Sequence, residues 1–385
     1  MSPPNTFHDA ITRFAAWTRR FWARLSDGLE LHQLWSQFWS EAQAGYRLYS
    51  YDVNAAAPAS PQHGPLATIR GFFWAILMKL GPARRVVLLV AVILVLIPSV
   101  QIHNGKSQFE TDTNGFPFLG GLLLLILLVL EIADRVTMKR DLQIAREIQL
   151  WLVPTATPDL PGLDVVWMNR PQNTVAGDYY DAFSRDTAAG PRVLLVVADV
   201  AGKSIPAALL MATFQASLKT LCATPCSLME LVNGLNRYSC AHSNDGRRFT
   251  TAFFAEFDPA TGQLEYINAG HNLPLLRETS GAIVKLQEGG LPIGIVEGTP
   301  YSMGRRILAP GDLLLIYTDG LVEAENAREE QFGEARTIAW ILSEDAADVK
   351  SGLDRLTNQL QAFVGTTVQH DDITCLLVRR RGERG

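Results

Sequence analysis

Two uninterrupted apolar runs restrict what this chain can fold into more than any other feature of its sequence. The first extends from Val86 to Ile102 and the second from Phe116 to Leu130, and neither contains a charged residue. The length of each run is close to the about 20 residues that a helix needs to cross the hydrocarbon core of a bilayer. Basic residues precede the first run and follow the second, whereas the segment between them contains one Lys and two acidic residues. By the positive-inside rule we expect a transmembrane hairpin within residues 71–133, with spans at about 86–102 and 116–133.

This hairpin predicts a multi-pass protein of the inner (cytoplasmic) membrane with two spans. Both termini and everything after the second span would then lie in the cytoplasm. The first run begins after residue 80, which excludes a cleaved signal peptide.

The residues before the hairpin divide into an aromatic-rich segment, 1–51, and a proline-containing linker, 52–70. Apolar side chains between residues 31 and 39 recur at the spacing of an amphipathic helix. Two interpretations stay open: a small helical unit with its own core, or a helix lying in the membrane interface. Residues 1–85 contain nine Lys and Arg against five Asp and Glu, which fits proximity to anionic lipid. The whole chain has a net charge of −5, so the remainder is acidic, which argues against nucleic acid as its partner.

After the hairpin, residues 134–158 predict a charged linker helix. Its apolar positions approximate a short heptad pattern, so it could pair with a second copy in a homodimer or pack on the following domain. Residues 159–381 alternate short apolar strands and helices, and turns such as Asp-Pro-Ala-Thr-Gly at 258–262 indicate hairpins. This pattern predicts an α+β domain with antiparallel sheets and helices on their outer faces.

Four acidic clusters stand at the ends of predicted strands or in the turns that follow. In chain order they are AGDYYD at 176–181, ADVAGKS at 198–204, YTDG at 317–320 and HDDIT at 370–374. Grouped carboxylates repel one another unless cations neutralise them, and Mg²⁺ and Mn²⁺ prefer oxygen ligands. One such cluster is an ordinary turn or helix cap, but four beside strands indicate a site for two divalent ions that activate a water for attack on phosphorus.

These segments resemble the bacterial branch of the metal-dependent (PPM-type) serine/threonine protein phosphatases, which is similar to sporulation stage II protein E and to stress sigma-factor regulators. The likeness covers about residues 142–380 and includes VAGDYYDAF, LLVVADVAGKS, INAGHNLPLL, LLLIYTDGLVEAEN and HDDITCLLV. It implies that residues 159–381 form an α-β-β-α sandwich of two mainly antiparallel sheets. It also implies two Mn²⁺ or Mg²⁺ ions and hydrolysis of phosphoserine or phosphothreonine on a protein.

Carried over motif by motif, the resemblance implies specific site residues. The metal ligands would be Asp178, Asp199, Asp319 and Asp371, together with the backbone carbonyl of Val200. The four aspartates would act in catalysis through metal-bound hydroxide. Asp372, beside a ligand, is expected to support the site without binding metal.

Two positions depart from the family pattern. Ala176 replaces the first glycine of Gly-Gly-Asp, and Ser204 replaces the second glycine of Gly-Lys-Gly, where we expect it to cap a helix. Neither change removes a ligand. Arg170 and Lys203 are weak candidates for binding substrate phosphate, with a solvated lysine as the alternative for Lys203. For His271, in a Gly-His-Asn turn, bonding to the backbone is preferred over general acid catalysis.

The sequence therefore predicts a membrane-anchored phosphatase that acts on a phosphorylated regulatory protein. By family analogy alone, that substrate is a STAS-type anti-sigma-factor antagonist. The alternative is a catalytically silent, membrane-tethered binding module with the same fold. Expected partners are the substrate protein, membrane lipid and a second copy of the chain. The four cysteines are interpreted as structural thiols, since no spacing completes a zinc site.

Overall fold

A computed structural model gives the architecture of the chain. It describes residues 80–96, 115–243, 248–344 and 348–382. The expected aromatic-rich segment and its linker lie outside these residues. The chain forms two compact units, Met1–Asp134 and Arg135–Gly385.

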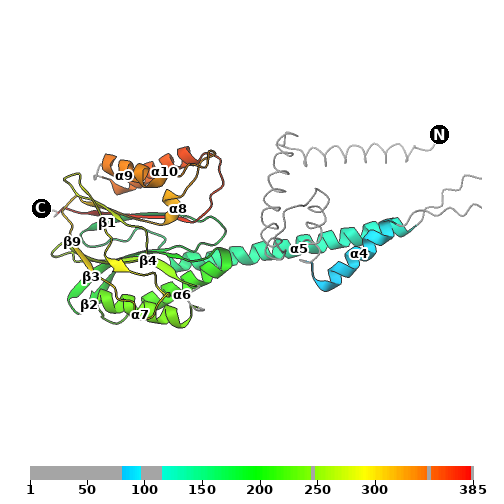
Figure 1. Cartoon of the computed structure of the whole chain (residues 1–385), viewed down its shortest axis with the longest axis horizontal. Coiled ribbons are helices and arrows are strands. Elements are labelled where there is room, and N and C mark those ends of the chain that lie inside the picture. Colours follow the sequence, from blue (N-terminus) through cyan, green and yellow to red (C-terminus); the bar gives the residue numbers. More distant parts are fainter. Residues whose placement is uncertain (1–79, 97–114, 244–247, 345–347, 383–385) are drawn as a thin grey trace, which may run out of the picture. The chain divides into compact units, whose positions relative to one another are not determined.

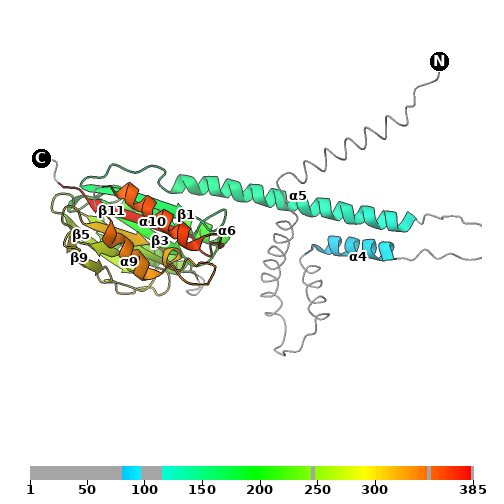
Figure 2. The ribbon, with the colours of Figure 1, turned by 90° about the horizontal axis from the view of Figure 1, so that it is seen from above.

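The first unit contains helix α4 (Pro82–Leu96) beside the first part of α5 (Gly115–Leu152) (Figures 1 and 2). A small residue permits this contact, because a β-carbon on Gly120 would lie 2.8 Å from the carbonyl oxygen of Ala91. Arg84 donates a hydrogen bond of 2.6 Å to the carboxylate of Asp134. The two apolar helices expected from the sequence therefore precede the C-terminal domain and pack on each other.

Helix α5 is a single 38-residue helix that includes both the second apolar run and the charged segment after it. By length and composition, it and α6 (Ser204–Cys222) are the described helices that could cross a membrane. The two differ in environment. α6 packs its Met211, Phe214 and Leu218 side chains into a soluble core, whereas the apolar run of α5 is largely exposed.

The second unit contains two β-sheets, whose strands are β1 (Leu163–Arg170), β2 (Tyr179–Thr187), β3 (Gly190–Val200), β4 (Thr250–Phe257), β5 (Gln263–Ala269), β6 (Leu275–Arg277), β7 (Ile283–Lys285), β8 (Gly289–Gly290), β9 (Gly304–Ile307), β10 (Leu313–Tyr317) and β11 (Ile373–Arg380). One sheet has the order β1-β11-β10-β6-β7. The other has the order β2-β3-β4-β5-β8, with β9 also pairing with β5. All pairs are antiparallel except β5 with β8.

Helices cover both outer faces of this sandwich (Figure 1). They are α6, α7 (Leu228–Ala241), the short α8 (Asp319–Val322), α9 (Gly333–Ser343) and α10 (Val349–Val364). α9 and α10 lie over the first sheet, and α6 and α7 lie over the second. The predicted α-β-β-α sandwich is confirmed.

The apolar runs of β3 and β10 are explained by burial on both faces. In β3, Leu195 and Val197 point into the layer between the sheets, while Leu194 and Val196 pack under α6 and α7. In β10, Leu314 points between the sheets, and its neighbours pack under α9 and α10. Asp199, near the end of β3, and Asp319, just after β10, are therefore attached to strands that are buried on both faces.

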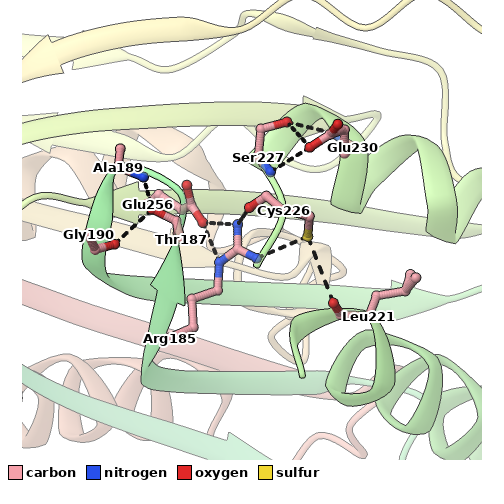
Figure 3. Close-up of polar contacts among 9 residues, drawn as sticks. All are labelled: Arg185, Thr187, Ala189, Gly190, Leu221, Cys226, Ser227, Glu230 and Glu256. Carbon is pink, nitrogen blue, oxygen red and sulfur yellow. Dashed lines mark hydrogen bonds and ion pairs between the residues drawn. The ribbon is translucent and has the colours of Figure 1, made fainter. Parts of the chain in front are cut away.

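A buried ion pair fixes one part of the second sheet (Figure 3). The guanidinium of Arg185 in β2 pairs with Glu256 in β4, and both side chains are almost fully buried. It also donates to the carbonyl of Cys226 at 3.0 Å and to its sulfur at 3.3 Å. The adjacent Ser227 and Glu230 form a capping box that starts α7. The four cysteines are free, consistent with structural thiols.

Candidate functional site

The first two acidic clusters meet because β2 and β3 form an antiparallel hairpin. Tyr179 pairs with Ala198, so Asp178, just before β2, lies next to Asp199 near the end of β3. The carbonyl oxygen of Val200 is also close, 3.4 Å from the position that a β-carbon on Gly177 would take. Three of the five predicted ligands thus share one end of the second sheet.

The other two clusters meet at one end of the first sheet. β10 and β11 are antiparallel, and Tyr317 pairs with Cys375. Asp319, which begins α8, therefore lies close to Asp371, which precedes β11. The turn after β10 requires glycine, because a β-carbon on Gly320 would lie 2.0 Å from a carbonyl oxygen.

Thr318 joins these two ends across the sandwich. Its hydroxyl donates to the Asp178 carboxylate at 3.0 Å, and it accepts from the backbone N–H of Thr374 at 2.9 Å. The Thr318 N–H donates to the Thr374 carbonyl at 3.0 Å. One side chain of the first sheet is thereby hydrogen-bonded to the candidate ligand of the second.

The electrostatics agree with a carboxylate cluster. Burial, followed by the charge of Asp199, raises the pKa of Asp178 well above its usual value. Burial and then the charges of Asp319 and Asp371 raise the pKa of Asp199 to about 7. Burial likewise raises the pKa of Asp319. Such shifts mean that nearby cations would stabilise the ionised carboxylates.

Asp372 has a different environment from its neighbour. Its two oxygens accept from the backbone N–H groups of Gln172 and Gly177, both at 2.6 Å. It therefore holds the backbone that precedes Asp178, which fits the supporting role expected from its position.

The two basic candidates lie near the cluster but already have partners. The Lys203 amine lies 3.2 Å from the Asp371 carboxylate and donates to the His370 carbonyl at 2.7 Å. Arg170 donates to Gln361 at 2.8 Å. Binding of phosphate by Lys203 would compete with its ion pair to Asp371.

Oxygen donors, burial and mutual repulsion make this set chemically suited to Mg²⁺ or Mn²⁺. In the described part of the chain, however, no group of three His, Cys, Asp or Glu side chains is arranged to hold an ion. The Lys203 amine beside Asp371 supplies a positive charge at this point.

The two departures from the family pattern have different consequences. Ala176 does not have positive φ, so its β-carbon causes no backbone strain. Ser204 has φ +61°, a left-handed conformation that glycine adopts more easily. The expectation that Ser204 caps α6 is wrong, because Lys203 is the N-cap residue and no side chain caps the helix.

The Gly-His-Asn turn is stabilised by a residue outside it. Asn268 accepts from the His271 N–H at 2.7 Å and donates to the His271 carbonyl at 3.0 Å. The His271 ring is buried and contacts the Thr251 hydroxyl at 3.1 Å. Its burial favours the structural interpretation over acid catalysis.

Sequence reasoning missed two residues that position the site. Thr318 stands inside the quoted YTDG motif, but the motif does not reveal its bond across the sheets. Gln149 in α5 makes two hydrogen bonds to the backbone of Ala176. In the sequence, Gln149 is a polar residue at one of the heptad positions of the predicted linker helix that are otherwise apolar, and this exception is the signal that could have revealed it.

Comparisons with known proteins agree with this architecture. Protein IcfG of Synechocystis is 26% identical over 309 residues, which are 73% of this chain and 48% of that protein. Phosphoserine phosphatase RsbU of Bacillus subtilis is 28% identical over 249 residues, 63% of this chain and 71% of that protein. The matched part of the chain thus spans about half the length of IcfG and 71% of the length of RsbU.

Among solved structures, the SiaA-PP2C domain of Pseudomonas aeruginosa is similar in fold. It is 21% identical, with a TM-score of 0.55, over 64% of this chain and 98% of that domain. The family model described as Stage II sporulation protein E (SpoIIE) matches residues 189–381, half of the sequence. The chain therefore belongs to the SpoIIE family and carries its PP2C-type domain.

Proposed function

We propose that this protein is a membrane-anchored phosphatase that hydrolyses phosphoserine or phosphothreonine on a regulatory protein. The observation that carries the proposal is the Thr318–Asp178 hydrogen bond, which joins the acidic ends of the two sheets. Family membership and the similarity to a protein named phosphoserine phosphatase support the same activity.

In this proposal Asp178, Asp199, Asp319, Asp371 and the Val200 carbonyl hold two Mg²⁺ or Mn²⁺ ions. When bound, the ions supply charge neutralisation at the phosphate and an activated water. The chain itself keeps the ligands in place through Thr318 and Asp372.

The substrate is proposed to be a phosphorylated STAS-type antagonist of an anti-sigma factor. This rests on family analogy and on the similarity to RsbU. The domain fold is compatible with other phosphoproteins, so the substrate is a separate question from the reaction.

We further propose that α4 and α5 anchor the protein in the inner membrane, with both termini in the cytoplasm. Exposed apolar side chains such as Ile93, Leu125 and Leu128 would contact lipid. Cysteines introduced at Ser107 and at Ser2 can be compared for labelling by an impermeant maleimide in intact cells. Labelling at residue 107 alone agrees with this topology, and labelling at residue 2 contradicts it.

A homodimer through α5 is proposed from three exposed apolar residues after the membrane segment. Ile144, Ile148 and Trp151 are 46%, 48% and 81% exposed, at spacings of four and three residues. Residues at these spacings lie on one face of a helix, as the contacting positions of a coiled coil do. Light scattering of the detergent-solubilised protein should give a dimer mass that Ile148→Glu converts to a monomer mass.

The catalytic proposal is tested with the full chain in nanodiscs. With Mn²⁺ or Mg²⁺ it should hydrolyse p-nitrophenyl phosphate and a phosphoserine peptide, and EDTA should abolish both reactions. Asp319→Asn should reduce the rate at least about 100-fold, which is the typical effect of removing one group that stabilises the transition state electrostatically. Asp354→Asn removes an exposed carboxylate of α10 and serves as the matched control.

A wild-type chain that is folded but inactive with every divalent ion would favour the alternative, a silent binding module. Equal activity in Asp319→Asn would place the chemistry elsewhere.

A further inference from the structure

A cavity of about 300 Å³ opens beside the candidate metal ligands. It adjoins Asp371 and Gly320, the residue after Asp319, and lies between the segment 365–373 and the turn that follows α8. A residue next to the phosphoserine of a bound substrate would therefore be within reach of this cavity.

The floor of the cavity is apolar. Leu360 and Ile373 are almost fully buried there, and Val364 continues this surface. At the rim, the side chain of Val368 is 76% exposed. An aliphatic chain entering the cavity would contact Leu360 and Ile373 and would remove the exposed side chain of Val368 from water.

Two carboxylates, Glu323 and Glu325, also line the cavity. In the described residues neither has an ion-pair partner within 4.0 Å, whereas Lys203 is paired with Asp371 and Arg170 is bonded to Gln361. Arg170 keeps its positive charge, because Gln361 is neutral, so the two glutamates outweigh it and leave the lining with a net charge of about −1. It is complementary to a cation with an apolar stem, which describes a lysine or arginine side chain.

We infer that this cavity binds a lysine or arginine that flanks the phosphorylated residue of the substrate. The inference rests on the proposed phosphatase function and adds to it a determinant of substrate choice. The phosphate is held at the aspartate cluster, the aliphatic stem of the basic residue covers the Leu360–Val364 surface, and its charge lies between Glu323 and Glu325. These residues determine specificity and take no part in the reaction.

The test uses the full chain in nanodiscs and phosphoserine peptides with one lysine at successive positions on either side of the phosphoserine. Matched peptides replace lysine by norleucine, which keeps the stem and removes the charge, or by glutamate. At the preferred position, kcat/KM should be about five- to tenfold higher for lysine than for norleucine, as expected for two partly exposed ion pairs. The preference should decrease as ionic strength rises.

The variant Glu325→Gln should lose part of the preference for lysine through a higher KM. Its rate on p-nitrophenyl phosphate, which has no flanking residue, should remain that of the wild type. Glu297→Gln, an exposed glutamate outside the cavity, should keep the preference. Val368→Ser should weaken binding of both the lysine and the norleucine peptides, because it removes an apolar contact to the aliphatic stem that the two peptides share.

A second measurement separates this inference from the proposed function. Binding of fluorescent peptides to the Asp319→Asn variant, followed by anisotropy, needs no turnover and should show the same order of affinity. Hydrolysis without any lysine preference would overturn the inference and leave the phosphatase assignment intact. Lysine-selective binding without hydrolysis by the wild type would support the cavity and overturn the phosphatase.

Discussion

The side chain of Gln149 in α5 makes both of its amide hydrogen bonds to the backbone of one residue, Ala176. Nε2 donates to the Ala176 carbonyl at 2.6 Å, and the Ala176 N–H donates to Oε1 at 3.0 Å. Ala176 lies two residues before Asp178, and Asp372 holds the intervening Gly177. The charged part of α5, after its apolar run, thus holds the backbone from which a candidate ligand projects.

This arrangement predicts that Gln149→Glu weakens metal binding. The glutamate keeps the length of the side chain but loses the donor, and its charge opposes the Ala176 carbonyl. A lost hydrogen bond of about 1 kcal/mol corresponds to an about fivefold rise in the Mn²⁺ concentration for half-maximal activity. Calorimetric titration with Mn²⁺ gives a second readout that does not depend on turnover.

Gln143→Glu, on an exposed part of the same helix, is the control for this change. Equal Mn²⁺ dependence in the two variants would show that the Gln149 contact does not influence the site.

A second prediction concerns Ser204, which has φ +61° at the start of α6. Ser204→Gly should stabilise the protein by about 1 kcal/mol, because glycine removes the cost of a left-handed conformation. Ser217→Gly, inside the same helix, should instead destabilise it by about 0.5–1 kcal/mol. Denaturant unfolding of the two variants measures both values, and the same sign for both would refute the strain argument.

The buried pair of Arg185 and Glu256 makes a third prediction, on stability. Arg185→Met leaves Glu256 buried and uncompensated, and it should lower the free energy of unfolding by about 3–5 kcal/mol. Burial already raises the pKa of Glu256, and Arg185 partly offsets this effect. The double variant Arg185→Met/Glu256→Leu should regain most of the loss, since no charge remains buried. A double variant as unstable as Arg185→Met would mean that the contacts to Cys226 dominate.

The fourth prediction is a dependence of stability on pH at His271. Burial lowers the pKa of His271 to about 4 in the folded protein, from 6.5 when unfolded. Between these values the unfolded chain binds a proton that the folded protein does not. His271 therefore has no effect on stability above pH 6.5 and costs up to about 3 kcal/mol as the pH falls towards 4.

Comparison of the wild type with His271→Gln isolates this contribution. Between pH 7.5 and pH 4.5 the wild type should lose up to about 3 kcal/mol of unfolding free energy relative to His271→Gln. His242→Gln, at the exposed end of α7, should not reproduce the change. A pH-independent difference for His271→Gln would contradict the prediction.

Much of the fold could be predicted from the sequence because local patterns determine it. The alternation of strands and helices predicted for residues 159–381 is present, and the turn at 258–262 joins the antiparallel strands β4 and β5 as expected. Short strands such as β6, with three residues, and β8, with two, contain too few residues to show a periodicity. Ser204 was expected to cap α6 because serine is common at that position, but Lys203 is the N-cap residue. The preference of a residue type for a position therefore does not determine the local backbone geometry.

The sequence by itself determined which residues are acidic, that they follow strands, and that two apolar runs precede the domain. Only the tertiary structure decided which carboxylates share one end of the sandwich and which are engaged by backbone amides. Asp371 and Asp372 are neighbours in the chain, yet one faces Lys203 while the other binds Gln172 and Gly177. The reason is physical: a local pattern records burial and turn formation, whereas the partner of a side chain depends on strand register and on contacts between residues far apart in the chain.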